Sequence, residues 1–303
     1  PLARRLAGAS NSPVVRINNA RYLTPEMRTF PVRMYQGAAQ IARLDSDVTI
    51  LAETDTCPHN RYSTGAHLMH AHYTGSILEG CHGAKHWLTR THAFQPDSGS
   101  AYRAILAQYR EFYRTLFLSV RESAPADYVA VALPSLPVYN PTSDCGNSSG
   151  SAGTWSPVMG VLGLPCNYAR MPNLPAMMTG EDVPLFPDED LRLLLRNGLL
   201  LDGSAAEALD RRGFADAIGV RAEPWTGPTV SAERWGEILL RCDTRYSRLE
   251  ALTTRTRISS ILLHRKSGVS ETFSELAPAV TLFENVEGGR VATLAASCGA
   301  GLS

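Results

Sequence analysis

Residue types that can act as ligands, acids, bases or nucleophiles are concentrated between positions 53 and 92. Seven of the eight histidines and two of the six cysteines lie there, and Glu53 stands first, at the end of a short apolar run that begins at Val48. The run has the composition of a buried strand, and a polar segment follows it. Parallel α/β sheets place their functional groups at the carboxyl ends of the strands. We therefore predict that residues 53–92 hold the functional site, with Glu53 as its central carboxylate.

The histidines and cysteines of this stretch are also possible zinc ligands. The residues concerned are Cys57, His59, His67, His70, His72, Cys81 and His82. Their spacing matches neither a zinc finger, a ribbon nor an HExxH motif, so a closed four-ligand site is the less favoured interpretation. The favoured one is that the imidazoles hydrogen-bond in a polar pocket, where His70 and His72 bind hydroxyl groups of a ligand. We predict no metal and no cofactor.

The composition predicts an ordinary globular protein, and its charge balance does not disfavour a neutral partner such as a sugar. Hydrophobic residues make up 44% and charged residues 19% of the 303 positions, which excludes a disordered chain. Lysine plus arginine (29) balance aspartate plus glutamate (29), so no net field favours nucleic acid or an anionic membrane. No apolar run reaches the roughly 20 residues of a membrane span. The scattered cysteines and the absence of a signal-peptide pattern in the first residues predict a cytoplasmic location.

Alternating apolar runs and amphipathic stretches predict the elements that position this segment. In the first part of the chain we expect strands over Val14–Ile17, up to Glu53, and over Ala84–Thr89, and helices over Met27–Leu44, Ala66–Leu78 and Ala101–Val120. This is a series of β/α units. A break at 122–127 separates it from a second series of different composition, which predicts a domain boundary there.

The second part of the chain is also predicted to be α/β. We expect strands over Tyr128–Leu133, Cys166–Met171, Leu199–Leu201, Ile258–His264, Ala279–Glu284 and Arg290–Ala295, and helices over Val158–Leu162, Asp188–Asn197 and Ser204–Arg212. Asp202 or Ser204 is expected to cap the last of these helices. The Gly288-Gly289 pair predicts a hairpin between the last two strands.

Three segments together resemble β-galactosidase-type glycoside hydrolases that carry a trimerisation domain. They read ILAETDTCPHNRYST, HAHYTGSILEGCHGAKHWLTR and NGLLLDGSAAEALDRRGFADAIGV. The resemblance implies an α/β fold in which 1–124 form the C-terminal half of a clan A (β/α)8 TIM barrel. It further implies that 125–224 form a flavodoxin-like or amidotransferase-like α/β trimerisation domain, and that 225–303 complete this domain and begin a small β-rich region. The chain begins at Pro1 without a methionine, so we expect it to be a fragment that lacks the first barrel strands.

The resemblance also implies roles for individual residues. Glu53 falls at the seventh-strand position, where clan A enzymes carry the nucleophile, and Trp87 matches the aromatic platform beneath the sugar. Asp55, Asn60, Arg61 and Arg90, with His70 and His72, are expected to bind sugar hydroxyls. Simpler structural roles stay open for four of them: Glu53 as an ion-paired or capping carboxylate, Trp87 as core, and Asn60 with Arg61 as loop-stabilising residues.

The function predicted in this way is the hydrolysis of β-linked hexosides with retention of configuration. Such enzymes need two carboxyl groups about 5 Å apart, and the resemblance places the acid/base upstream of this sequence, so the fragment alone is expected to be inactive. The expected partner is a carbohydrate substrate and the expected assembly a homotrimer. The first alternative is a non-catalytic carbohydrate-binding or assembly module; the second is a zinc-dependent hydrolase that uses the histidine and cysteine cluster.

Overall fold

The computed structural model shows a mixed α/β protein with parallel and antiparallel sheets. It describes residues 13–17, 37–55, 64–88, 96–123, 129–134, 154–155, 158–160, 162–164, 166–169, 171–241, 244–266 and 272–298. The chain divides into two compact units, the first containing the described residues up to 123 and the second those from 129 onward. Within the described parts, none of the helices combines the length and the apolar character that crossing a membrane requires.

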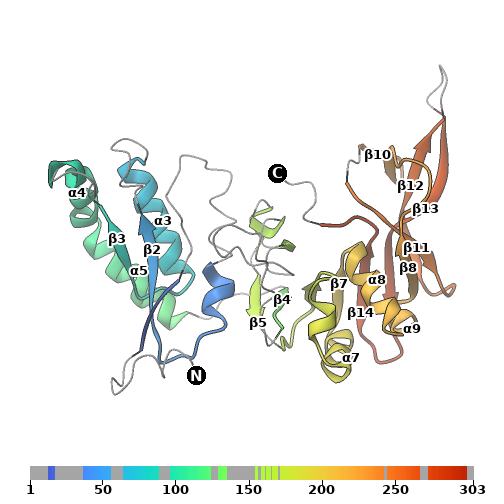
Figure 1. The fold of residues 1–303 in the computed structure, drawn as a ribbon, viewed down its shortest axis with the longest axis horizontal. Helices are drawn as coiled ribbons and strands as arrows, with labels where there is room; N and C mark the ends of the chain where they lie inside the picture. Colours follow the sequence, from blue (N-terminus) through green and yellow to red (C-terminus); the bar gives the residue numbers. More distant parts are fainter. Residues whose placement is uncertain are drawn as a thin grey trace. The chain divides into compact units, whose positions relative to one another are not determined.

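The first unit is built on a three-stranded parallel sheet in the order β1-β2-β3 (Figure 1). Its elements are β1 (Val14–Ile17), β2 (Thr49–Asp55), α3 (Ala66–Leu78), β3 (Gly83–Trp87), the 3₁₀ helix η2 (Pro96–Gly99), α4 (Ser100–Gln108) and α5 (Arg110–Glu122). The predictions for β1 and α3 are confirmed residue by residue. Strand β2 runs two residues beyond Glu53. Most of the helix predicted over 27–44 lies outside the described residues, and its last part, 37–41, is helical.

The single helix predicted over 101–120 is wrong, because the structure divides it into α4 and α5 at Tyr109. The apolar periodicity continues through this position, so the sequence pattern does not reveal the break. Both helices contact α3, and the change of direction at Tyr109 allows one amphipathic stretch to cover two parts of that helix.

Two small hydrophobic clusters lie among the described residues of the first unit. One gathers Ile17, Ile50 and Ala52 on one face of the sheet with partly buried Ile41 and Leu44. The other lies among the helices and consists of Met69, Tyr102 and Ile105, with partly buried neighbours. Side chains alternate between the two faces of a strand. The residues that lie between these apolar positions of β1 and β2 therefore point to the opposite face of the sheet.

The second unit contains a nine-stranded mixed sheet in the order β10-β9-β12-β13-β14-β7-β6-β4-β5 (Figure 1). Its strands are β4 (Ala130–Ala132), β5 (Asn167–Ala169), β6 (Ala176–Met178), β7 (Leu199–Leu201), β9 (Ala232–Trp235), β10 (Ile238–Arg241), β12 (Arg257–Arg265), β13 (Phe273–Glu284) and β14 (Arg290–Leu294). Strands β5, β4, β6, β7 and β14 pair in parallel, and the others pair antiparallel. Strands β8 (Val220–Pro224) and β11 (Ser247–Ala251) form a separate antiparallel pair.

The helices of the second unit from residue 171 onward are η3 (Val183–Leu185), α7 (Asp188–Asn197), α8 (Gly203–Arg211) and α9 (Ala215–Ile218), and residues 154–155 and 158–160 are also helical. Asp202 caps α8 as predicted, since its Oδ1 accepts a hydrogen bond from the backbone N–H of Ala205 at 2.8 Å. The predicted hairpin is also confirmed, because β13 and β14 pair antiparallel and Gly288 adopts a φ of +84° between them.

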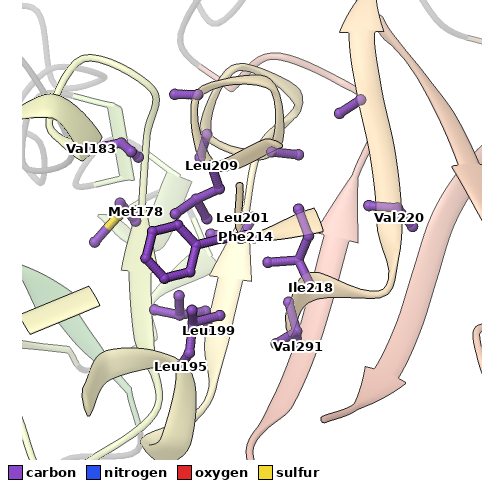
Figure 2. Close-up of a cluster of buried hydrophobic side chains, with 14 of the residues drawn as sticks. Met178, Val183, Leu195, Leu199, Leu201, Leu209, Phe214, Ile218, Val220 and Val291 are labelled. Carbon is purple, nitrogen blue, oxygen red and sulfur yellow. The ribbon is translucent and has the colours of Figure 1, made fainter. Parts of the chain in front are cut away.

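One continuous hydrophobic cluster holds the second unit together. Figure 2 shows the Phe214 ring among the side chains of Met178, Leu199 and Leu209. Leu201 and Leu209 are completely buried. Fully burying an aliphatic side chain contributes roughly 1.5–3 kcal/mol, so a cluster of this size accounts for much of the stability of the unit.

Candidate active site

Glu53 lies on the face of the first sheet opposite the helix-packed face. Parallel pairing sets Glu53 beside Lys85 and Asp55 beside Trp87. Their neighbours Thr54 and His86 occupy the other face, where Tyr73 of α3 contacts the His86 ring edge-on with a centroid distance of 5.2 Å. Alternation along the strands therefore brings Glu53, Lys85 and Trp87 to one side. We call this side, together with Arg16, the Glu53 face.

Arg16 reaches Glu53 from the neighbouring strand. Strand β1 pairs with β2 so that Arg16 stands beside Leu51, one position along the same face from Glu53, and its Nη1 forms an ion pair with Glu53 Oε1. The Glu53 side chain is 13% exposed and that of Arg16 is 46% exposed. The pair orients the carboxylate while leaving part of it accessible, and an ionised carboxylate is the form that a nucleophile requires.

Trp87 ends β3 with a cation above its ring. The Nζ atom of Lys85 lies 5.2 Å from the centre of the indole. Such a contact is worth only about 0.5–1 kcal/mol at an accessible site, so the apolar face of another molecule can compete for the ring. Lys85 thus lies over an aromatic surface that is partly accessible, on the same face of the sheet as Glu53.

Four other site residues predicted from the sequence are described only in part or lie outside the described residues. Asp55 ends β2 opposite Trp87, but only its backbone is described. Asn60, Arg61 and Arg90 lie outside the described residues. For these four positions the predicted contact with hydroxyl groups stays a prediction.

His70 belongs to the contact between α3 and α5. Its Nδ1 lies 2.8 Å from the hydroxyl oxygen of Tyr113, and its ring stacks on Tyr109 with a centroid distance of 4.1 Å. Burial, followed by the nearby charge of His67, lowers the pKa of His70 below its ordinary value. Its ring is therefore used for helix packing in this structure.

His72 is completely buried on the inner side of α3. Its carbonyl oxygen accepts a hydrogen bond from the Ser76 hydroxyl at 2.8 Å. A side chain without solvent exposure does not contact a substrate that arrives from solution. The contact predicted between His72 and a sugar hydroxyl is therefore not part of the proposed site.

The zinc alternative gains no support from the described part of the chain. No group of three or more histidine, cysteine, aspartate or glutamate side chains there is arranged to hold a metal ion. His82 accepts a hydrogen bond at Nδ1 from the Ile50 backbone N–H, at 3.0 Å. Burial, followed by the charge of Glu79, raises the pKa of Cys81 to about 12, which opposes the thiolate that zinc needs. Cys57 and His59 lie outside the described residues.

Two residues of the Glu53 face were not singled out from the sequence. Lys85 could have been found from the alternation in GAKHW, which puts it on the same face as Trp87. Arg16 interrupts the apolar run VVRI in the same way, but its pairing with Glu53 depends on which strands are neighbours. That information does not lie in the local sequence.

Comparison with known proteins gives a likeness in fold alone. No family model and no curated protein sequence matches the chain. Among solved structures, an exo-β-1,4-mannosidase from Opitutaceae bacterium strain TAV5 is similar with a TM-score of 0.56 at 14% identity, covering 95% of this chain and 55% of that one.

Two further solved structures have comparable scores. A catalytic mutant of a GH42 β-galactosidase from G. stearothermophilus has a TM-score of 0.53 at 11% identity, covering 97% of this chain and 48% of that one. The α-L-fucosidase isoenzyme 2 from Paenibacillus thiaminolyticus has a TM-score of 0.52 at 10% identity, covering 89% and 43%. The chain thus spans about half the length of the glycoside hydrolases that share its fold.

Proposed function

We propose that this chain is part of a retaining glycoside hydrolase that acts on β-linked hexosides, with Glu53 as the nucleophile. The observation that carries the proposal is the position of Glu53 toward the carboxyl end of a parallel strand, oriented by Arg16 and on the same face as Trp87. The likeness in fold to three glycosidases supports the same reaction class. A β-galactoside is the default substrate and a β-mannoside the runner-up.

The proposed mechanism has two steps. Glu53 attacks the anomeric carbon and forms a covalent glycosyl-enzyme while a carboxylic acid protonates the leaving oxygen. The same acid, now acting as a base, then activates the water that releases the sugar. In this proposal the acid/base lies about 5 Å from Glu53 and comes from outside residues 1–303.

The neighbours of Glu53 have distinct roles in the proposal. Arg16 is a positioning residue, because it acts through the Glu53 carboxylate. Trp87 offers its ring to the apolar face of the pyranose, and Lys85 moves from the ring to a sugar hydroxyl. Asp55, Asn60, Arg61 and Arg90 remain proposed hydroxyl contacts.

The decisive experiment replaces Glu53 in the intact protein and follows the hydrolysis of aryl β-galactosides and aryl β-mannosides. We expect Glu53→Gln to lower kcat by roughly four powers of ten or more, because the covalent route is lost. Sodium azide should restore turnover of Glu53→Ala and give a glycosyl azide of inverted configuration.

Glu111→Gln is a matched control, since Glu111 is a solvent-exposed carboxylate on α5. It should leave the rate unchanged. Near-wild-type activity of Glu53→Gln, with the fold intact, would reject the assignment.

The proposal carries two wider predictions from the resemblance. Residues 1–303 alone should not cleave natural β-glycosides, since general acid catalysis is worth roughly 100- to 10,000-fold. The intact protein should form a homotrimer. Sedimentation combined with activity measurements on the same samples tests both predictions, and a monodisperse, fully active monomer of this chain would contradict them.

A further inference from the structure

We propose that a pocket in the second unit binds an uncharged saccharide. This pocket, which we call the α8 pocket, has a volume of about 600 Å³ and is lined by Ser204, Glu207, Trp225, Thr229, Arg245 and Tyr246, among others. Its size lies within the range of small-molecule sites, roughly 300–1,000 Å³. The inference goes beyond the proposed function, because the lining residues belong to the second unit and none of the Glu53 face takes part.

Trp225 supplies a preorganised aromatic wall. Its indole N–H donates a hydrogen bond to the Pro228 carbonyl oxygen at 2.9 Å, so the ring is fixed by its own loop. Gly227 lies against the ring so closely that an added Cβ would stand 3.0 Å from Cζ2. The indole also packs against the large hydrophobic cluster. A ring held in this way stacks on the C–H face of a sugar without losing side-chain entropy on binding.

Two opposite charges supply the polar contacts. The Glu207 carboxylate is held by the Ser247 hydroxyl, which donates to Oε1 at 2.5 Å, and by Arg211 at 3.5 Å from Oε2. Each carboxylate oxygen has a second lone pair for a ligand hydroxyl. The backbone carbonyl of Arg245 accepts a hydrogen bond from the Ser297 N–H at 2.8 Å, which holds the residue at the pocket. Its exposed side chain forms no hydrogen bond or ion pair with the described residues, so the guanidinium can donate to a ligand.

The rest of the pocket explains why a neutral ligand fits best. The Ser204 hydroxyl already has hydrogen-bond partners, since it donates to Asp202 Oδ1 at 2.8 Å and accepts from the Gly180 N–H at 3.0 Å. These bonds fix its side chain in the wall of the pocket. A singly charged ligand would be attracted by one of Glu207 and Arg245 and repelled by the other, so its charge brings no net gain. A polyhydroxyl ring with one apolar face satisfies the acceptor, the donor and the aromatic wall together.

Hydrogen–deuterium exchange of the intact protein tests the proposal locally. We expect methyl β-galactoside or methyl β-mannoside, at millimolar concentration, to protect the peptides that contain 225–230 and 244–247 in a saturable manner. Arg245→Ala and Trp225→Ala should each raise the half-saturating concentration about tenfold or more, because central anchors dominate binding. Arg248→Ala is the matched control, since Arg248 is an exposed arginine on β11 that does not line the pocket, and it should have no effect.

Arg245→Ala keeps the test decisive even where Trp225→Ala unfolds, because the Arg245 side chain is exposed and its removal leaves the backbone hydrogen bond to Ser297 in place. Absence of local protection by both sugars would overturn the proposal, as would protection that Arg245→Ala leaves unchanged. Stronger protection by galacturonate than by methyl β-galactoside would show an anion site instead. Glu53→Gln should change none of these results, so failure here and failure of the proposed function are distinguishable.

Discussion

The two units of this chain use their β-sheets in opposite ways. In the first unit the described sheet has three strands, and the face that bears Glu53 carries the charged side chains of Arg16 and Lys85 as well as Leu51. In the second unit nine strands support one continuous cluster of buried aliphatic residues. The difference indicates that the first sheet gives up packing on one face to expose polar groups, whereas the second sheet is built chiefly for stability.

Buried carboxylates show the same contrast. In the second unit, burial raises the pKa of Asp202, while hydrogen bonds from Ser204, Ala205 and Thr179 oppose the shift. In the first unit, burial alone raises the pKa of Glu79 to about 7. A partly buried carboxylate without compensating hydrogen bonds lowers stability when it is ionised, so the first unit bears at Glu79 a cost that hydrogen bonds reduce at Asp202 in the second.

The largest expected effect compares the two cores directly. Leu209→Ala should destabilise the second unit by about 3–5 kcal/mol, because the cavity lies among completely buried neighbours that cannot collapse into it. Ile50→Ala in the first unit should cost nearer 2 kcal/mol, since partly exposed Ile41 and Leu44 can relax. Urea unfolding monitored by hydrogen exchange in each unit measures both values. Equal costs would contradict the contrast between the cores.

Much of this fold could be predicted from local pattern. The 13 residues of α3 were delimited correctly, and the α8 cap and the β13–β14 hairpin follow from a single aspartate and a glycine pair. Strand β6 (Ala176–Met178) was not predicted from the sequence. Strands β8 to β11 were missed because they are short and mostly polar or exposed, so their hydrophobic pattern is weak.

The candidate site could be predicted only in part, because some of its contacts depend on which strands are neighbours. The common face of Glu53, Lys85 and Trp87 follows from alternation once β2 and β3 are paired in register. The contact between Arg16 and Glu53 requires β1 and β2 to be neighbours, although 37 positions separate the two residues. His70 was assigned to a ligand from its residue type, whereas tertiary packing on Tyr109 decides its environment.

The second prediction concerns pH and tests the uncompensated carboxylate of the first unit. Because the pKa of Glu79 rises on folding from about 4.5 to about 7, the folded state binds more protons than the unfolded state between these values. The contribution of Glu79 to the free energy of unfolding is therefore greatest below about pH 4.5. It falls by roughly 3 kcal/mol as the pH rises through about 7. Glu79→Gln should remove this fall. The measurement is the free energy of unfolding on both sides of the window.

Comparison with the variant is needed because another group of the first unit, His86, affects stability in the opposite sense as the pH changes. Burial lowers the pKa of His86, so its contribution to stability is lost as the pH falls below about 6.5. Both proteins share this background, and the difference between their pH curves isolates Glu79. Parallel pH curves for the two proteins would show that ionisation of the Glu79 carboxyl does not lower the free energy of unfolding.

The smallest expected change in stability is also the sharpest test of the Glu53 face. Arg16→Met keeps the apolar stem, and an ion pair with a half-exposed arginine is worth at most about 1 kcal/mol, so the unfolding free energy should barely change. If Arg16 orients the proposed nucleophile, kcat for an aryl β-glycoside should fall roughly 10- to 100-fold while KM changes little, because misplacing a reacting group by about 1 Å costs this much. Arg16→Lys should recover part of the rate. An unchanged kcat in Arg16→Met would show that the ion pair is a surface contact without a role in catalysis. A large loss of stability would instead mean that the face contributes to the fold, and the contrast between the two sheets would have to be abandoned.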